Sequence, residues 1–416
     1  MPIRHNVCLL NRFPDRRSPI RPLMQPLTLS HYTLVSALGL GLGATLTALR
    51  ERRSGLRPCD FLDAGLDTYI GRVDGLEEAP IIGELSCFDC RNNRLAQMAL
   101  RQDGFEEAVA AARERYGAHR IGVIIGTSTS GILETELAYQ RRDPETGALP
   151  PTFNYQHTHN TFSVTDFTRR HLGLTGPALA ISTACSSSAK VFASAQRLIA
   201  SNFCDAAVVG GVDSLCLTTL YGFSALELVS DRPCRPADVR RNGISIGEAG
   251  GFALLERTGS GEVALLGYGE STDAYHMSSP HPEGQGAALA MRQALQRAGL
   301  TPDCIDYINL HGTATKANDI AEDRAIVGIL GKGTPSSSIK GWTGHTLGAA
   351  GIVNAIVSCL CIREGFAPPS LNTETLDPEI GGWILLDELK RPIDYVLSNA
   401  FGFGGNNASL VFGRAG

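Results

Sequence analysis

Short apolar runs alternate with longer helix-like segments along most of the chain. Continuous apolar runs bounded by glycine or polar residues are typical of buried β-strands, and four have this character: 121–126, 178–182, 206–211 and 250–255. Three segments predict helices, the last two of them rich in alanine and apolar all round: 186–200, 286–298 and 348–364. This alternation predicts an α/β protein with parallel or mixed sheets covered by helices.

Two segments share the same strand–turn–helix motif. Residues 182–188 (STACSSS) lead from a predicted strand into the helix at 186–200. Residues 344–351 (GHTLGAAG) lead from a strand-like run at 336–340 into the helix at 348–364. Small residues at the start of both helices permit close packing. The repetition predicts a duplicated fold whose helices are buried between sheets.

Composition and charge narrow the class of protein. The chain has 416 residues, of which 43% are hydrophobic and 19% charged, as expected for a globular protein with a large core. A net charge of −5 argues against non-specific nucleic-acid binding. The eleven cysteines are scattered, and Cys87 and Cys90 have no second pair or histidine at zinc spacing, so we expect reduced thiols and no metal site.

The first residues contain no hydrophobic run. Residues 1–23 are rich in arginine and proline, and we expect a disordered extension or a start codon placed upstream of Met24. Arg16-Arg17 followed by the apolar run 34–49 raises the possibility of a twin-arginine export signal. That run is broken by glycines and too short to cross a bilayer. We therefore expect a cytoplasmic protein without a membrane span.

Cys185 is a candidate nucleophile, because it follows a predicted strand and precedes a predicted helix among small hydroxyl residues. A thiolate at a helix N-terminus is stabilised by the helix dipole and by unpaired backbone N–H groups. The same N–H groups can hold a developing oxyanion. The alternative is that Cys185 is one more buried small hydrophobic residue, as most cysteines are.

Polar residues in the second half could complete a site. His311 follows a strand-like run, and Lys340 and His345 flank the second strand–helix junction. Asp319 and Glu322, about one helical turn apart, offer carboxylates that could hold Lys340 and orient the histidines. A capped structural histidine and solvated helix charges are the alternatives.

A glycine-rich segment near the C-terminus alternates with phenylalanine. Residues 398–407 (SNAFGFGGNN) follow the predicted strand at 395–397. The glycines would let the backbone approach a ligand, and the phenylalanine rings could swing as a lid. The segment lacks the order of a phosphate-binding loop. The alternative is a plain turn between two strands.

Taken in order, these motifs resemble the signatures of β-ketoacyl-acyl carrier protein synthases I and II. They are ACSS at 184–187, HGTAT at 311–315, Lys340 with GH at 344–345, and GFGG at 402–405. The similarity extends from about residue 34 to the C-terminus and includes 241–243, 247–250 and 273–277. The resemblance implies a thiolase-like fold: two duplicated βαβαβαββ halves, 24–265 and 266–416, in a five-layer αβαβα body that usually forms a homodimer.

The resemblance also implies a decarboxylative condensation that extends a carrier-bound acyl chain by two carbons. It assigns roles by position: Cys185 as the acyl-accepting nucleophile; His311 and His345 in decarboxylation and enolate stabilisation; Lys340, Asp319 and Glu322 as a charge network; Thr313 and Thr315 on the phosphopantetheine arm; Phe403 as gate and oxyanion donor; Phe223 and Ile132 in the acyl pocket. The implied partner is acyl carrier protein, and no cofactor is implied beyond the carrier's own phosphopantetheine.

Two alternatives within this superfamily are disfavoured by the sequence, and a third concerns the partner subunit. A degradative thiolase would carry a second cysteine within 400–407, and a class III synthase would have asparagine at His345; neither is present. A chain-length factor would lack the nucleophile, although this chain could pair with such a subunit. Asn406 replaces the threonine common at this place in the family. Fatty-acid elongation and a dedicated polyketide or aryl-polyene pathway are both compatible with the sequence.

Docking of an acidic carrier protein would need a basic rim around the site. Arg141 with Arg142, and Arg91 with Arg94, are the candidates in the sequence. Solvated surface arginines are the alternative for each of them.

Overall fold

The computed structural model describes residues 23–415. The expectations for residues 1–22, including the disordered extension and the Arg16-Arg17 pair, lie outside this range. The four strands predicted from apolar runs are all present, and the three predicted helices match α6, α8 and α11 to within two residues at either end.

The first half of the chain forms a sheet of five strands. Their spatial order is β1 (Leu27–Ser36), β9 (Ala249–Glu256), β7 (Ala206–Asp213), β5 (Ile121–Gly126) and β6 (Ala178–Ile181). β7, β5 and β6 are parallel, whereas β9 is antiparallel to both of its neighbours. Every residue of β5, β7 and β9 is buried, which accounts for their continuous apolar runs.

The second half repeats this arrangement. Its order is β10 (Val263–Thr272), β17 (Asn406–Arg414), β16 (Tyr395–Gly402), β11 (Tyr307–Asn309), β12 (Pro335–Ser337) and β14 (Trp383–Ile384). β17 occupies the antiparallel position, as β9 does in the first half. A short antiparallel pairing of β1 with β10 joins the halves into one 12-stranded sheet, which includes β2 (Gly39–Leu40). The predicted duplication is confirmed.

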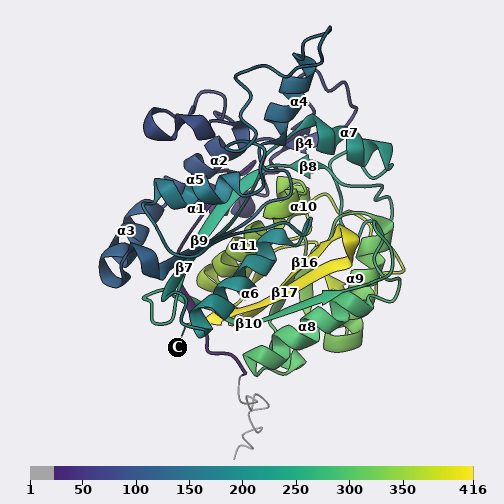
Figure 1. The fold of residues 1–416 in the computed structure, drawn as a ribbon. Coiled ribbons are helices and arrows are strands. Elements are labelled where there is room, and N and C mark those ends of the chain that lie inside the picture. The colour runs from purple at the N-terminus through teal and green to yellow at the C-terminus, as the bar shows by residue number, and fades with distance from the viewer. Residues whose placement is uncertain (1–22, 416) are drawn as a thin grey trace, which may run out of the picture.

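Helices complete five layers, as Figure 1 shows. α6 (Ser187–Ala200) and α11 (Ala350–Glu364) lie between the two halves of the sheet. The first half is covered by α2 (Arg91–Leu100), α3 (Phe105–Tyr116) and α5 (Ser163–His171), and the second by α8 (Gln285–Ala298) and α9 (Lys316–Leu330). The fold is thiolase-like, with the predicted αβαβα order.

Small residues let the two central helices pack closely. A Cβ added at Gly351 of α11 would lie 2.3 Å from the backbone nitrogen of Ala189 in α6. Residues 350–362 of α11 are buried throughout. The segment Leu347–Glu364 is long and apolar enough to cross a membrane, but 89% of it is buried inside the fold, as expected of a core helix.

The remaining elements are short or lie outside the five layers. β3 (Leu56–Pro58), β4 (Tyr69–Gly71) and β8 (Ile246–Gly247) form a small sheet, and β13 (Phe366–Ala367) pairs with β15 (Leu389–Lys390). α1 (Gly41–Arg50) packs on β1, and α4 (Ile132–Gln140) packs on α7 (Leu217–Ala225). Five 3-10 turns are η1 (Gly83–Phe88), η2 (Ala118–Arg120), η3 (Pro302–Cys304), η4 (Leu347–Ala349) and η5 (Phe403–Gly405).

Three element boundaries differ from the sequence prediction. The strand expected at 336–340 ends at Ser337, and Lys340 begins the short helix α10 (Lys340–Thr343). Residues 398–401, expected in a loop, all belong to β16, whose carbonyl and N–H groups pair with β17. The strand expected before His311 is only the three residues of β11.

Candidate active site

Cys185 lies in a sharp turn between β6 and α6. Ala184, the residue before it, has a left-handed φ of 51°, which is unusual for a residue other than glycine. The Ser187 hydroxyl holds the turn, because it donates to the Ala184 carbonyl at 2.6 Å and accepts from the Thr183 N–H at 2.9 Å. The turn therefore fixes Cys185 at the N-terminal end of α6, with only 5% of its surface exposed.

His345 is in direct contact with the thiol. Its Nε2 lies 3.1 Å from Cys185 Sγ. Its backbone is clamped by the segment around β8: the His345 N–H donates to the Ser245 carbonyl at 2.7 Å, and its carbonyl accepts from the Gly247 N–H at 3.0 Å. These bonds position the ring independently of the thiol.

His311 approaches from the end of β11 in the other half of the duplication. Its ring centroid is 5.4 Å from that of His345, and the two planes are nearly perpendicular at 81°. The carboxylate of Glu322 fixes the loop, because one oxygen accepts from the His311 N–H and the other from the Gly312 N–H, both at 2.8 Å. The predicted cysteine and both predicted histidines are brought together.

The two predicted acids separate into different environments. Glu322 lies beside Lys340, whose buried Nζ has no hydrogen-bond partner within residues 23–415. Asp319 instead accepts from the Ala237 and Ala314 N–H groups and forms an ion pair with Arg241 at 3.4 Å. The ion pair of Asp319 is with the guanidinium of Arg241, while its charge also acts on Lys340, less strongly than that of Glu322, so the charge network of these three residues stays a prediction.

Burial dominates the electrostatics of the site. It raises the pKa of Cys185 to about 11, against the lowering effects of the Lys340 charge and the Phe403 N–H. Burial, followed by the Lys340 charge, holds the pKa of both His311 and His345 well below the usual range. Burial also lowers the pKa of Lys340, which Glu322 and Cys185 oppose. At neutral pH the site therefore holds a protonated thiol and two neutral imidazoles.

The glycine-rich segment closes over Cys185. The Phe403 N–H lies close enough to the Cys185 thiol to lower its pKa, and the Phe403 ring lies 5.5 Å from the Phe223 ring. A Cβ on Gly402 would come within 2.7 Å of the Thr183 carbonyl oxygen, so only glycine allows this close approach. The Gly404 N–H donates to the Met277 carbonyl at 2.7 Å and ties the turn to the 273–281 loop.

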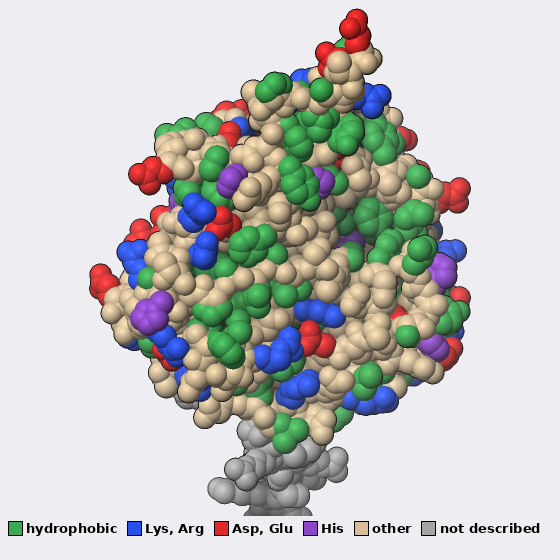
Figure 2. Space-filling model, in the orientation of Figure 1, with side chains coloured by type: hydrophobic (Ala, Val, Ile, Leu, Met, Phe, Trp, Pro, Cys, Tyr) green, Lys and Arg blue, Asp and Glu red, His purple; other side chains and the backbone are tan. Residues whose placement is uncertain are grey.

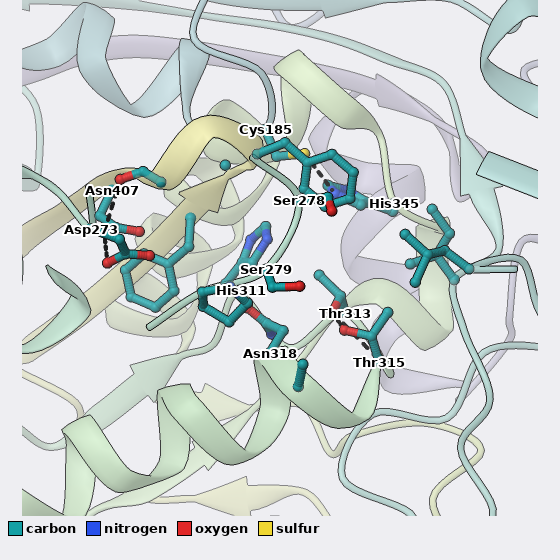
Figure 3. A pocket seen from close by; sticks show the side chains of 18 of the residues that line it. Cys185, Asp273, Ser278, Ser279, His311, Thr313, Thr315, Asn318, His345 and Asn407 are labelled. Carbon is teal, nitrogen blue, oxygen red and sulfur yellow. Dashed lines mark hydrogen bonds between the residues drawn. The ribbon is translucent and has the colours of Figure 1, made fainter. Parts of the chain in front are cut away.

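A cavity of about 290 Å³ leads to the thiol (Figure 3) and opens in a hollow on the face shown in Figure 2. Thr313 and Thr315, whose hydroxyls are 2.9 Å apart, line it together with Phe223 and Phe403. Ile132 does not line it, although it packs in the same apolar cluster as Phe223.

Sequence reasoning assigned no role to several lining residues. The Phe401 ring lies 5.8 Å from the His311 ring at a tilt of 59°, and Asp273 accepts from the Asn407 amide at 2.9 Å on the cavity wall. Asp273 lies in the 273–277 motif, which could have suggested it. Phe401 carried no separate signal, because its role depends on β16 extending to Gly402.

Of the four arginines considered for docking, Arg91 is a wrong prediction. It is buried, and it binds Glu248 at 2.6 Å and Glu77 at 2.5 Å inside the fold. Arg94 binds Asp89 at 2.6 Å. Arg141 and Arg142 are exposed just after α4, and Arg141 lines a different cavity from that of Cys185.

A thiol at a helix N-terminus, two neutral imidazoles and two backbone N–H groups suit thioester chemistry through a covalent acyl intermediate. Together with the duplicated five-layer fold, they define a condensing enzyme of the thiolase-like class.

Comparison with known proteins supports this class of enzyme. Residues 90–260 match the family of the β-ketoacyl synthase N-terminal domain, and residues 263–374 match its C-terminal domain. The chain is 36% identical over 417 residues to 3-oxoacyl-[acyl-carrier-protein] synthase 2 of Vibrio cholerae, covering 92% of this chain and 97% of that protein. The corresponding enzyme of Rhizobium meliloti is 39% identical over 315 residues, covering 70% of this chain and 74% of that protein.

Solved structures give the same result. The ketosynthase ApeO of Xenorhabdus doucetiae, in complex with its chain length factor ApeC, superposes with a TM-score of 0.84 at 38% identity, covering 94% of this chain and 98% of that one. The ishigamide ketosynthase/chain length factor gives a TM-score of 0.84 at 27% identity, over 94% of this chain and 100% of that one. The chain belongs to the β-ketoacyl synthase family and is a condensing acyltransferase.

Proposed function

We propose that this chain condenses a malonyl unit with an acyl group held on Cys185. The observation that carries the proposal is the 3.1 Å contact between Cys185 Sγ and His345 Nε2, with His311 facing the same cavity. Acyl transfer forms the Cys185 thioester, and the Cys185 proton leaves on the carrier thiol. In the second step, the histidines and the backbone N–H groups have separate roles.

In that second step, malonyl-carrier protein loses CO₂ and leaves an enolate. The neutral His311 and His345 rings donate to the enolate oxygen, while the Cys185 and Phe403 N–H groups hold the oxyanion of the attacked thioester. The enolate carbon displaces the Cys185 thiolate, which takes up one proton from water to restore the thiol. The product is a β-ketoacyl thioester longer by two carbons, and the reaction so written needs no metal or organic cofactor of the enzyme.

Carrier protein and its phosphopantetheine are the proposed substrates of the cavity. The Thr313 and Thr315 hydroxyls stand on its wall, where they can hydrogen-bond the amides of a pantetheine arm. Arg141 and Arg142 remain candidates for contact with an acidic carrier. Lys340 and Glu322 act as the charge pair behind the histidines. We place the enzyme in the cytoplasm, since its apolar helix α11 is a buried core element.

A two-subunit enzyme is the second proposal. β6 is the last strand on its side of the sheet, and Leu179 in it is 41% exposed. This edge could pair with a second copy of the chain. The alternative partner is a chain-length factor, which the complexes of the X. doucetiae and ishigamide ketosynthases favour. The choice between fatty-acid elongation and a dedicated polyketide or aryl-polyene pathway depends on which of these partners the chain uses.

Replacement of the nucleophile tests the proposed function. Cys185→Ala should abolish acyl transfer and elongation of acyl-carrier protein, measured by mass spectrometry of the carrier-bound product. Cys87→Ala, at an exposed cysteine outside the site, is the matched control and should retain both activities. Elongation by the Cys185→Ala protein at the control rate would refute the assignment. The acyl group trapped on Cys185 from cell extract would identify the pathway.

A further inference from the structure

Lys190 is a half-buried lysine that the proposed reaction does not use. It lies in the first turn of α6, where its backbone N–H donates to the Ser186 carbonyl at 3.1 Å. Its Nζ donates to Asn406 Oδ1 at 3.2 Å and forms no ion pair within the described residues. The carboxylate of Glu270 acts on Lys190 through its charge, but it is already bound by Arg197 at 2.6 Å. A partly desolvated ammonium is thus directed at a neutral amide.

Asn406 stands at the end of the turn that carries Phe403. It directly follows Phe403–Gly405, begins β17 and pairs in register with Gly402, so Gly402 and Asn406 close the turn. Gly404 at its tip has a left-handed φ of 77°, and a Cβ there would lie 3.4 Å from Asn406 Nδ2. The Asn406 amide therefore lies against the turn through one atom and against Lys190 through the other.

The other end of the same turn is fixed near Cys185. A Cβ built on Gly402 would lie 2.7 Å from the Thr183 carbonyl oxygen and 3.2 Å from the Cys185 nitrogen, and the adjoining Phe403 N–H lowers the pKa of the Cys185 thiol. The segment before α6 and the first turn of α6 thus hold the two ends of the turn: backbone contact at Gly402, and the Lys190 side chain at Asn406. Of these two contacts, the one between Lys190 and Asn406 can be removed by a side-chain substitution.

We propose that Lys190 is a positioning residue that, through Asn406, holds the 402–406 turn with the Phe403 N–H directed at Cys185. The proposal deepens the proposed function, because it concerns the oxyanion donor of that reaction. Without the Lys190 contact, the turn gains freedom and the Phe403 N–H spends less time at the thiol. Acyl transfer to Cys185 needs this donor, whereas loss of CO₂ from the malonyl unit relies on His311 and His345. Lys190 should therefore affect the two half-reactions unequally.

The test compares both half-reactions in the full chain. Lys190→Met should slow formation of acyl-Cys185 by about tenfold or more, since outright loss of an oxyanion donor costs about 10²–10³-fold. CO₂ release from malonyl-carrier protein should stay within about twofold of the unchanged protein. Lys190→Arg, which keeps a cationic donor, should restore most of the acyl transfer. Lys390→Met removes an exposed lysine paired with Glu388 and is the matched control.

Substitution of Asn406 examines the other side of the contact. Asn406→Asp keeps an acceptor for Lys190 and should retain acyl transfer in the otherwise unchanged chain. Combined with Lys190→Met, it leaves an unpaired carboxylate and should give the slowest transfer of the set. Acyl transfer at the unchanged rate in Lys190→Met overturns the proposal. An equal fall in both half-reactions with a lower Tm also overturns it, because that is the result of a purely structural role.

These outcomes are separate from those of the proposed function. If the unchanged protein forms no acyl-Cys185, the proposed function fails, whereas the Lys190 contact fails only when the unchanged protein is active and the variant equals it.

Discussion

Lys340 joins the nucleophile to the carboxylates behind it. It is buried without a hydrogen-bond partner among the described residues, and its charge acts on Cys185, Glu322 and both histidines. The same cation favours the thiolate of Cys185 and disfavours the imidazolium of each histidine. One buried charge therefore has two effects that favour the reaction: it lowers the free-energy cost of forming the thiolate, and it keeps the histidines as neutral N–H donors.

Removal of this charge should be visible in the pH dependence of alkylation. The Lys340 cation lowers a thiol pKa that burial raises to about 11, so Lys340→Met should raise it further. Because only the thiolate reacts, the rate should increase with pH across the neutral and mildly alkaline range in both proteins. At a fixed pH the variant should be slower by roughly tenfold for each unit of pKa.

Mass spectrometry of Cys185 after timed exposure to iodoacetamide measures this rate. Lys390→Met, which removes an exposed lysine paired with Glu388, should react with iodoacetamide at the rate of the unchanged protein. A Lys340→Met protein that reacts as fast as the unchanged one at every pH would show that the Lys340 charge does not reach the thiol.

At the residue scale, the sequence indicated the candidate reactive side chains better than it indicated which residues form ion pairs or hydrogen bonds with each other. Cys185 and His311 could be found because each follows closely after a strand among small residues, and His345 because small residues surround it, although α10 separates it from the end of β12. The partner of Asp319 could not, because Arg241 is 78 positions earlier and reaches it only in the folded chain. The Lys190 contact was hidden for the same reason, since Asn406 lies 216 residues away.

At the scale of elements, the positions of Cys185 and His345 depend on how closely α6 and α11 approach. Gly351 faces the backbone of Ala189, and Gly211 of β7 faces the Ser188 side chain at 2.4 Å from a built Cβ. The strands and helices could be predicted from periodicity, and the duplication from the two strand–turn–helix motifs. The α10 helix could not, because four residues carry no periodic signal.

Gly351→Ala should therefore destabilise the enzyme. An added methyl would lie 2.3 Å from the Ala189 nitrogen, which is backbone and cannot move aside cheaply, and overpacking of this kind costs about 1–3 kcal/mol. Gly328→Ala is the matched control: it also lies in a helix, α9, but its Cβ would meet nothing within 4 Å. That change should leave Tm equal or higher, because alanine favours helix by up to about 1 kcal/mol. A Tm for Gly351→Ala equal to that of Gly328→Ala would contradict the packing argument.

At the scale of the whole molecule, the open edge at β6 is the feature that a single chain leaves unexplained. β6 pairs with β5 on one side and with no strand on the other within residues 23–415. An unprotected edge strand invites pairing with another chain, and proteins that avoid this place charges on such edges. β6 (ALAI) carries none, and Leu179 exposes 41% of its surface. The edge therefore supports the proposed two-subunit enzyme.

A charge on this edge should separate the subunits. In light scattering after size-exclusion chromatography, the purified chain should have twice the mass of one chain, and Leu179→Lys should shift it to the single-chain mass with loss of elongation activity. Tyr139→Lys places the same charge on an exposed aromatic residue of α4 and tests whether any surface lysine has this effect. If the chain alone is already monomeric and inactive, but dimeric and active when a chain-length-factor subunit is co-expressed, the heterodimer is the functional form and Leu179→Lys should prevent that pairing. A monomer with full activity would rule out both assemblies, because the edge would then have no functional partner.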